Sequence, residues 1–122
     1  MHNARMPFRR PDSVLPLTPI SFEIILALLE GDRHGYAILQ AVEARLGGTL
    51  PLRTGTMYRA LARLLDEELI ERVEGDTAAD DHRRRYYRIT AHGRTVAKAE
   101  ARRLADQVEA ARAHKLIPGT RR

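Results

Sequence analysis

The spacing of hydrophobic residues changes twice along this chain, and the two changes constrain the fold more than any other feature. Between residues 18 and 68 apolar residues recur every three or four positions, which is the period of an α-helix. Between residues 68 and 90 they alternate as in β-strands, and the helical period then returns. The chain is therefore expected to form helices, then a pair of strands, then one more helix.

The first helical segment is apolar on more than one side. Thr18 is a good N-cap, Pro19 suits the first helical position, and Gly31 ends the helix. Its hydrophobic residues form two sets on different faces: Phe22, Ile25, Leu26 and Leu29, and Ile20, Ile24 and Leu28. Such a helix is expected to be buried on more than one side.

Two further helices follow. One is predicted over about Tyr36–Leu46, where Gly47 and Gly48 end it. The next begins at Thr54, which we expect to cap it, and ends near residue 68. Its buried stripe is predicted to contain Met57, Leu61, Leu64 and Leu65.

The strand-like segments are Glu68–Glu74 and Arg84–Thr90, with a polar loop between them. Two short strands joined in this way form a hairpin, or wing. Thr90 is then expected to cap a last helix that runs from about residue 91 to 114. The predicted fold is mainly α with a small β-hairpin: a winged helix-turn-helix plus one long C-terminal helix.

Composition restricts the class of protein. The 122 residues suffice for one domain, and the absence of cysteine excludes disulfides, thiolate metal sites and cysteine catalysis. No apolar run approaches the roughly 20 residues that span a bilayer, and the N-terminus does not resemble a secretory signal. We therefore expect a cytoplasmic protein.

The net charge of +5 is unevenly distributed. Residues 1–17 contain three basic residues and one acidic residue. Residues 18–81 contain six basic and twelve acidic residues, and residues 82–122 contain twelve basic and three acidic residues. An anionic partner is therefore expected to meet local basic patches rather than a uniformly basic surface.

The stretch RTGTMYRALARLL, Arg53–Leu65, lacks the strand, the glycine-rich loop and the lysine of a nucleotide-binding P-loop. It fits a DNA-reading helix better. Thr56, Arg59 and Arg63 share the face opposite the apolar stripe, where arginine can bind guanine and threonine can meet a base edge. The hydroxyls of Thr54 and Tyr58 are placed for backbone phosphates. The alternative is a solvated helix face on which Thr54 is only a cap.

The returning strand of the wing adds basic residues. Arg83 and Arg84 are the expected DNA contacts, whereas Arg85 and Arg88 can face the other way because strand side chains alternate. Three acidic residues of the loop, Asp76, Asp80 and Asp81, would repel phosphate. The two tyrosines, Tyr86 and Tyr87, are expected to pack within the hairpin.

The last helix carries a seam of small and apolar residues at alternating spacings of four and three, as in a coiled coil. The seam comprises Ala97, Ala101, Leu104, Val108 and Ala111. It predicts a homodimer, in which Phe22 and the rest of the first helix help to form the interface. The helix propensity of alanine is the alternative explanation for part of the pattern.

These residues resemble the PadR-like transcriptional regulators over roughly residues 17–113. The resemblance rests on LTPISFEIILALL, DRHGYAILQAVE, LRTGTMYRALARLLDEELIE and RRRYYRITAHGR. It implies a cytoplasmic homodimer, usually a repressor, that binds a pseudo-palindromic DNA operator and pairs through its C-terminal helix. Tyr36, Thr54, Thr56, Tyr58 and Arg59 would face DNA, and His34 and Gly35 would form a helix-entry turn.

The resemblance also implies release of DNA by a small aromatic or cationic effector that binds near the dimer interface. Such a site would lie around Phe22, Leu104 and Val108, although the chain has no tryptophan to stack a ligand and a plain core role is favoured for these residues. The domain assignment that follows is an arm at 1–16, a DNA-binding domain at 17–90, a dimerisation helix at 91–115 and a tail at 116–122.

Two other classes of function fit the sequence less well. An enzyme is disfavoured because the five histidines are scattered and no catalytic motif is present; Asp80, Asp81 and His82 are adjacent loop residues that seldom converge on a metal. No cofactor or metal is therefore expected. The main alternative is a winged-helix module that binds another protein without specific DNA binding.

Overall fold

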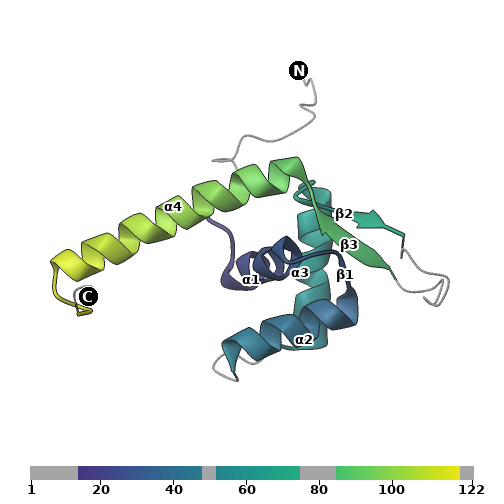
Figure 1. Cartoon of the computed structure of the whole chain (residues 1–122), viewed down its shortest axis with the longest axis horizontal. Helices are drawn as coiled ribbons and strands as arrows, with labels where there is room; N and C mark the ends of the chain where they lie inside the picture. Colours follow the sequence, from purple (N-terminus) through teal and green to yellow (C-terminus); the bar gives the residue numbers. More distant parts are fainter. Residues whose placement is uncertain (1–13, 48–51, 75–84, 119–122) are drawn as a thin grey trace, which may run out of the picture.

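The computed structural model describes residues 14–47, 52–74 and 85–118, which form four helices and a small sheet (Figure 1). In chain order the elements are α1 (Pro19–Leu29), β1 (Arg33–His34), α2 (Gly35–Leu46), α3 (Thr54–Asp66), β2 (Ile70–Val73), β3 (Tyr86–Ile89) and α4 (Ala91–Ala113). The predicted class, mainly helical with a hairpin and one long last helix, is confirmed.

The core is built around α1. Ile24, Ile25 and Leu28 of this helix are fully or almost fully buried, and they pack with residues from every other part of the body. Those partners include Ile38 and Val42 of α2, Met57, Leu61 and Leu64 of α3, Ile70, Tyr87 and Ile89 of the sheet, and Val96 of α4. The predicted stripe of α3 is confirmed, with Leu65 only partly buried.

One predicted face of α1 is less buried than its pattern indicated. Phe22 and Leu26 are partly exposed and Leu29 is exposed, whereas Ile25 from the same set lies in the core. Thr18 caps the helix as expected, since its Oγ1 accepts a hydrogen bond of 3.1 Å from the backbone N–H of Ser21. The single chain therefore covers α1 on one side and leaves an apolar strip open on the other.

The sheet contains three antiparallel strands in the order β1-β3-β2. Ile70 pairs with Ile89 and Val73 with Tyr86, so the predicted hairpin is present but shorter than expected. It starts late because Glu68 adopts a left-handed conformation (φ 63°) and the N–H of Leu69 bonds back to the carbonyl of Leu64 at 2.9 Å, which closes α3. Strand β1 was not predicted.

The long helix α4 packs on the body only at its start. Thr90 caps it, accepting a hydrogen bond of 2.9 Å from the N–H of Gly93, and its buried residues are Gly93, Val96, Ala97 and Glu100. Beyond Glu100 the helix runs past the N-terminal end of α1 and away from the body (Figure 1). Within the described ranges, none of the helices has the length and apolar character needed to cross a bilayer.

Glu100 is a buried carboxylate at the point where α4 leaves the body. Its side chain is 2% exposed and accepts two hydrogen bonds of 2.8 Å from the guanidinium of Arg103. These bonds hold the pKa of Glu100 below its ordinary value, against the opposing effect of burial, and a backbone hydrogen bond from Leu17 lowers it further. Glu100 thus joins α4 to the segment before α1, where Val14 and Leu17 are buried in the core.

We expect Glu100→Ala to lower the free energy of unfolding by about 1–3 kcal/mol, because the guanidinium of Arg103 and the backbone of Leu17 lose a buried acceptor. Glu109→Ala is the matched control: Glu109 makes the same i,i+3 pair with Arg112 at 2.8 Å but is exposed, so its loss should cost less than about 0.5 kcal/mol. Urea unfolding measures both, and equal costs would contradict a special role for Glu100.

The same pair predicts a pH dependence. Because the pKa of Glu100 is lowered in the folded state, its stabilisation is complete above the ordinary carboxyl pKa and is lost as the pH falls through the lowered value. The difference in unfolding free energy between the wild type and Glu100→Ala should therefore shrink on acidification. A difference that stays constant down to low pH would contradict the assignment.

Candidate nucleic-acid interface

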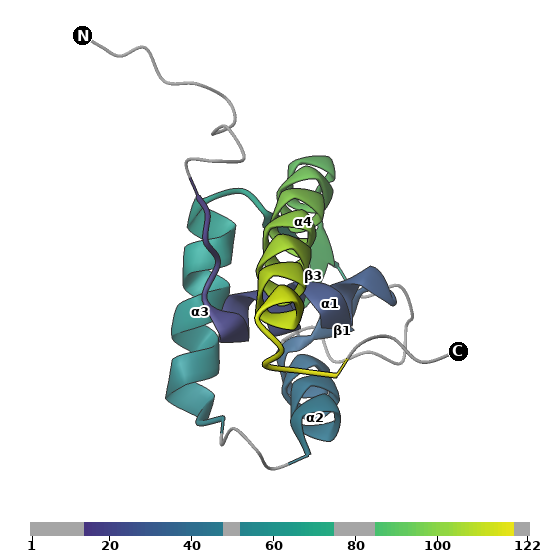
Figure 2. The same cartoon turned by 90° about the vertical axis from the view of Figure 1, so that its left-hand side faces the viewer.

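The exposed face of α3 carries the residues that the sequence analysis selected. The side chains of Thr54, Tyr58, Arg59 and Arg63 are exposed, and Thr56 is half-buried. Met57, Leu61 and Leu64 lie on the opposite, buried side. Figure 2 shows α3 at one edge of the body.

One prediction about this helix is wrong. Thr54 does not cap α3 but is its first helical residue; the N-cap position is Arg53, and among the described residues no side chain bonds to the free N–H groups there. Threonine is favoured at caps, but the chain enters the helix one residue earlier than that preference suggested. The hydroxyl of Thr54 therefore remains on the exposed first turn rather than being used within the helix.

The two arginines of this face are in different situations. Nη2 of Arg59 donates to Oγ1 of Thr56 at 3.3 Å, so the guanidinium lies along the helix surface beside a neutral hydroxyl. Nε of Arg63 lies 3.9 Å from a carboxylate oxygen of Glu67, a long contact that partly offsets its charge. Arg59 is consequently the stronger positive centre near the start of α3.

The start of α2 contributes Tyr36, whose side chain is 62% exposed. The turn before it is held by His34, whose Nδ1 accepts a hydrogen bond of 3.2 Å from the N–H of Ala37 and whose ring meets Tyr86 edge to face at 5.5 Å. The expected helix-entry turn at His34 and Gly35 is confirmed. Because β1 pairs with β3, the start of α2 is tied to the sheet.

Part of the wing lies in the described residues. Tyr87 is buried and Tyr86 partly buried, in agreement with a packing role. Arg88 is exposed but forms hydrogen bonds of 3.1 and 2.8 Å with Asp32, which raise its pKa and commit it to a contact within the protein. The loop residues Asp76, Asp80, Asp81, His82, Arg83 and Arg84 lie outside the described residues.

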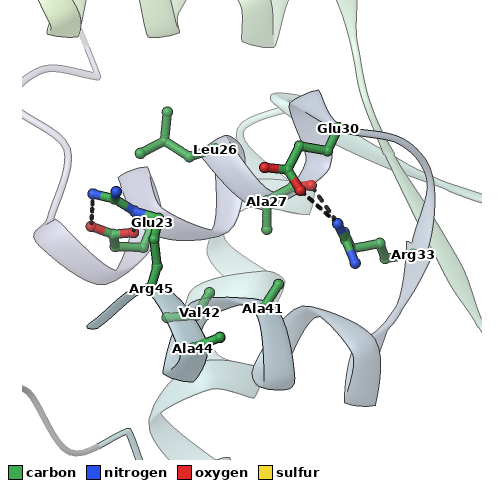
Figure 3. Close-up of a pocket in the computed structure, with 9 residues that line it drawn as sticks. All are labelled: Glu23, Leu26, Ala27, Glu30, Arg33, Ala41, Val42, Ala44 and Arg45. Atoms are coloured by element: carbon green, nitrogen blue, oxygen red, sulfur yellow. Dashed lines mark hydrogen bonds and ion pairs between the residues drawn. The ribbon is translucent and has the colours of Figure 1, made fainter. Parts of the chain in front are cut away.

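A groove between α1 and α2 was not predicted from the sequence. It has a volume of about 440 Å³, and Figure 3 shows an ion pair at each end, Glu23 with Arg45 and Glu30 with Arg33. Its floor consists of Leu26, Ala27, Ala41, Val42 and Ala44. The Glu23–Arg45 pair joins α1 to α2, whereas the Glu30–Arg33 pair links the end of α1 to β1. Nε of Arg33 also donates to the carbonyl of Ala27 at 3.0 Å, near the end of α1.

A second groove, of about 320 Å³, separates α1 from α4. It is lined by Phe22, Leu26, Leu29, Ala97 and Ala101, with Arg94 and Lys98 at its edge. Phe22 is thus brought together with the first half of the predicted seam. Leu104, Val108 and Ala111 do not line it and lie farther along α4, where Val108 is 45% exposed.

No group of three or more potential metal ligands occurs in the part of the chain that the structure describes. The polar groups that gather in one place are instead the hydroxyls and guanidinium groups of α3, beside the exposed Tyr36 at the start of α2. Hydroxyl and guanidinium donors of this kind suit an anionic, extended partner.

The sequence model of the Transcriptional regulator PadR-like family matches residues 24–99. Among individual proteins, the uncharacterized protein X of Lysinibacillus sphaericus is 38% identical over 71 residues, which are 58% of this chain and 64% of that protein. The chain thus spans somewhat less than two thirds of the length of this relative.

Three solved structures are similar to this one. The match to a transcriptional regulator from Clostridium thermocellum (TM-score 0.68, 26% identity) covers 81% of this chain and 90% of that chain. The match to a PadR family transcription regulator from Clostridium difficile (TM-score 0.68, 25% identity) covers 80% of this chain and 98% of that chain. Bacillus subtilis PadR in complex with operator DNA (TM-score 0.58, 21% identity) covers 69% and 47%, and at that identity shows the fold alone.

The His34 cap allows a direct test of how the start of α2 is held. We expect His34→Ala to reduce the free energy of unfolding by about 0.5–2 kcal/mol, because the N–H of Ala37 loses its acceptor. His34→Asn should recover most of the loss, since asparagine is a favoured N-cap. Equal destabilisation by both substitutions would show that the ring contact with Tyr86, and not the cap, accounts for the effect.

Proposed function

The chain belongs to the PadR-like family of transcriptional regulators, and from this premise we propose that it binds specific DNA sequences through the exposed face of α3. The observation that carries the proposal is the division of α3 into a fully buried apolar stripe and an exposed face that bears Thr54, Tyr58, Arg59 and Arg63. The family is one of regulators and not of enzymes.

In this proposal α3 enters the major groove with its N-terminal half toward the base edges. Arg59 reads a guanine through O6 and N7, and Thr56 contacts a neighbouring base. Thr54, Tyr58 and Tyr36 donate to phosphates and fix the orientation of the helix, while Arg63 adds a further contact. Arg83 and Arg84 of the wing are the last of the proposed DNA contacts. The proposed site of action is the cytoplasm.

We further propose that two copies pair through α4 and α1. The distal half of α4 and the residues that follow it carry exposed apolar side chains, with Val108 45%, Leu116 74% and Ile117 37% exposed. The open apolar strip of α1, with Ala97 and Ala101, forms a groove on the same molecule. A two-fold arrangement lets each copy supply both surfaces, with Leu104 and Ala111 in the seam, because an isologous interface uses the same patch twice.

A dimer of this kind presents two α3 helices to one DNA site, which fits a pseudo-palindromic operator whose half-sites are one turn apart. We propose that the bound dimer represses transcription and that a small aromatic or cationic effector weakens binding. The groove between α1 and α4, lined by Phe22, Leu26 and Leu29, is the proposed effector region because a ligand there would change how α4 sits on the body.

Arg59 provides the sharpest test of base reading. Arg59→Ala should weaken binding to a preferred duplex by about 1–3 kcal/mol, the value of one good base contact. Arg59→Lys should retain binding to a scrambled duplex while losing preference for the specific one, because lysine keeps the charge without the planar fork. Fluorescence anisotropy with both duplexes measures the two affinities. If both variants kept the wild-type preference for the specific duplex, Arg59 would not contact a base.

Val108→Asp tests the dimer without disturbing the monomer, since the side chain is largely exposed in the single chain. A charge in the seam should convert the dimer to a monomer in sedimentation velocity. Ala110→Asp is the matched control, because it lies two residues on and therefore on the other side of α4, and should leave the dimer intact. Dimers in both variants would rule out the seam.

A further inference from the structure

Gly35, the first residue of α2, lies directly against the side chain of Tyr58 from α3. A Cβ atom at position 35 would be 2.6 Å from the hydroxyl oxygen of Tyr58 and 3.2 Å from Cε1 and Cζ of its ring. Those are the three nearest atoms, and all belong to Tyr58. Any side chain at this position would therefore overlap the Tyr58 hydroxyl before it met anything else.

The backbone around Gly35 is held from several directions. His34 caps α2 through Ala37 and packs against Tyr86, and both residues of β1 are paired with β3. Tyr58, by contrast, is 47% exposed, and its hydroxyl is at the end of a side chain that can rotate. A collision at this point would consequently be relieved by movement of the Tyr58 ring toward solvent and not by movement of α2.

We propose that Gly35 is a positioning residue for DNA binding: the absence of a side chain there lets the Tyr58 hydroxyl rest against the first turn of α2, beside Tyr36. This inference rests on the proposed DNA contact of Tyr58. In this arrangement α2 holds the side chain of Tyr58 from α3, so that its hydroxyl is already oriented for DNA before binding. Preorganisation of this kind raises affinity because less freedom is lost on binding.

The inference separates DNA affinity from stability. Alanine favours helix formation over glycine, so Gly35→Ala should leave the free energy of unfolding unchanged or raise it slightly. If Gly35 mattered only for folding, the substitution would instead lower the free energy of unfolding. The expected result is thus a variant that is at least as stable as the wild type and binds DNA less tightly.

The test is a double-mutant cycle with a duplex selected by the wild-type protein from a random library. Gly35→Ala should weaken binding about tenfold, the order of one hydrogen bond to a charged group. In a Tyr58→Phe background the same change should cost less than about twofold, because the displaced hydroxyl is already absent. In an Arg63→Ala background, which leaves Tyr58 intact, Gly35→Ala should keep its full cost.

Equal costs of Gly35→Ala in the wild-type and Tyr58→Phe backgrounds would overturn the inference, as would unchanged affinity of Gly35→Ala when Tyr58→Phe binds weakly. NMR of ¹³C-labelled tyrosine rings gives a readout without DNA, because the chain has only four tyrosines. Gly35→Ala should shift the Tyr58 resonances most, and unshifted resonances would overturn the inference. Failure of the wild type to select any sequence would instead reject the proposed function, while the ring spectrum still decides whether Gly35 positions Tyr58.

Discussion

The burial of α1 organises the whole fold. Ile24, Ile25 and Leu28 are almost completely shielded from solvent, and that shielding requires α2, α3, the sheet and the start of α4 to pack around one short helix. Because α3 must present Met57, Leu61 and Leu64 to this centre, its opposite face is exposed by necessity. The candidate reading surface is therefore a consequence of how the core is closed.

Regular, repeated features were the ones that the sequence could predict. The stripe of α3 spans several turns, so its period identifies both the buried side and the exposed residues Arg59 and Arg63. Features that depend on one or two residues were not predictable. Strand β1 is two residues long and has no period, and Thr54 has the side chain of a cap but not the position of one.

Contacts between distant residues escaped the sequence analysis for a different reason. In the sequence Glu100 looks like any other charged residue of a highly charged helix, and its burial beside Leu17 becomes apparent only in the folded chain. The contact of Gly35 with Tyr58 depends on the crossing of two helices, which local spacing does not encode. The open apolar strip of α1 and the exposed apolar side chains near the end of α4 likewise become apparent only in the folded chain.

We propose that the exposed face of α3 binds DNA with sequence preference. Fluorescence anisotropy tests this binding when the wild-type protein is titrated into a duplex selected from a random library and into a scrambled duplex of the same composition, each at two salt concentrations. We expect tighter binding to the selected duplex, and weaker binding to both duplexes at the higher salt concentration, because contacts to phosphates release counterions. Equal, salt-insensitive binding to the two duplexes would contradict it.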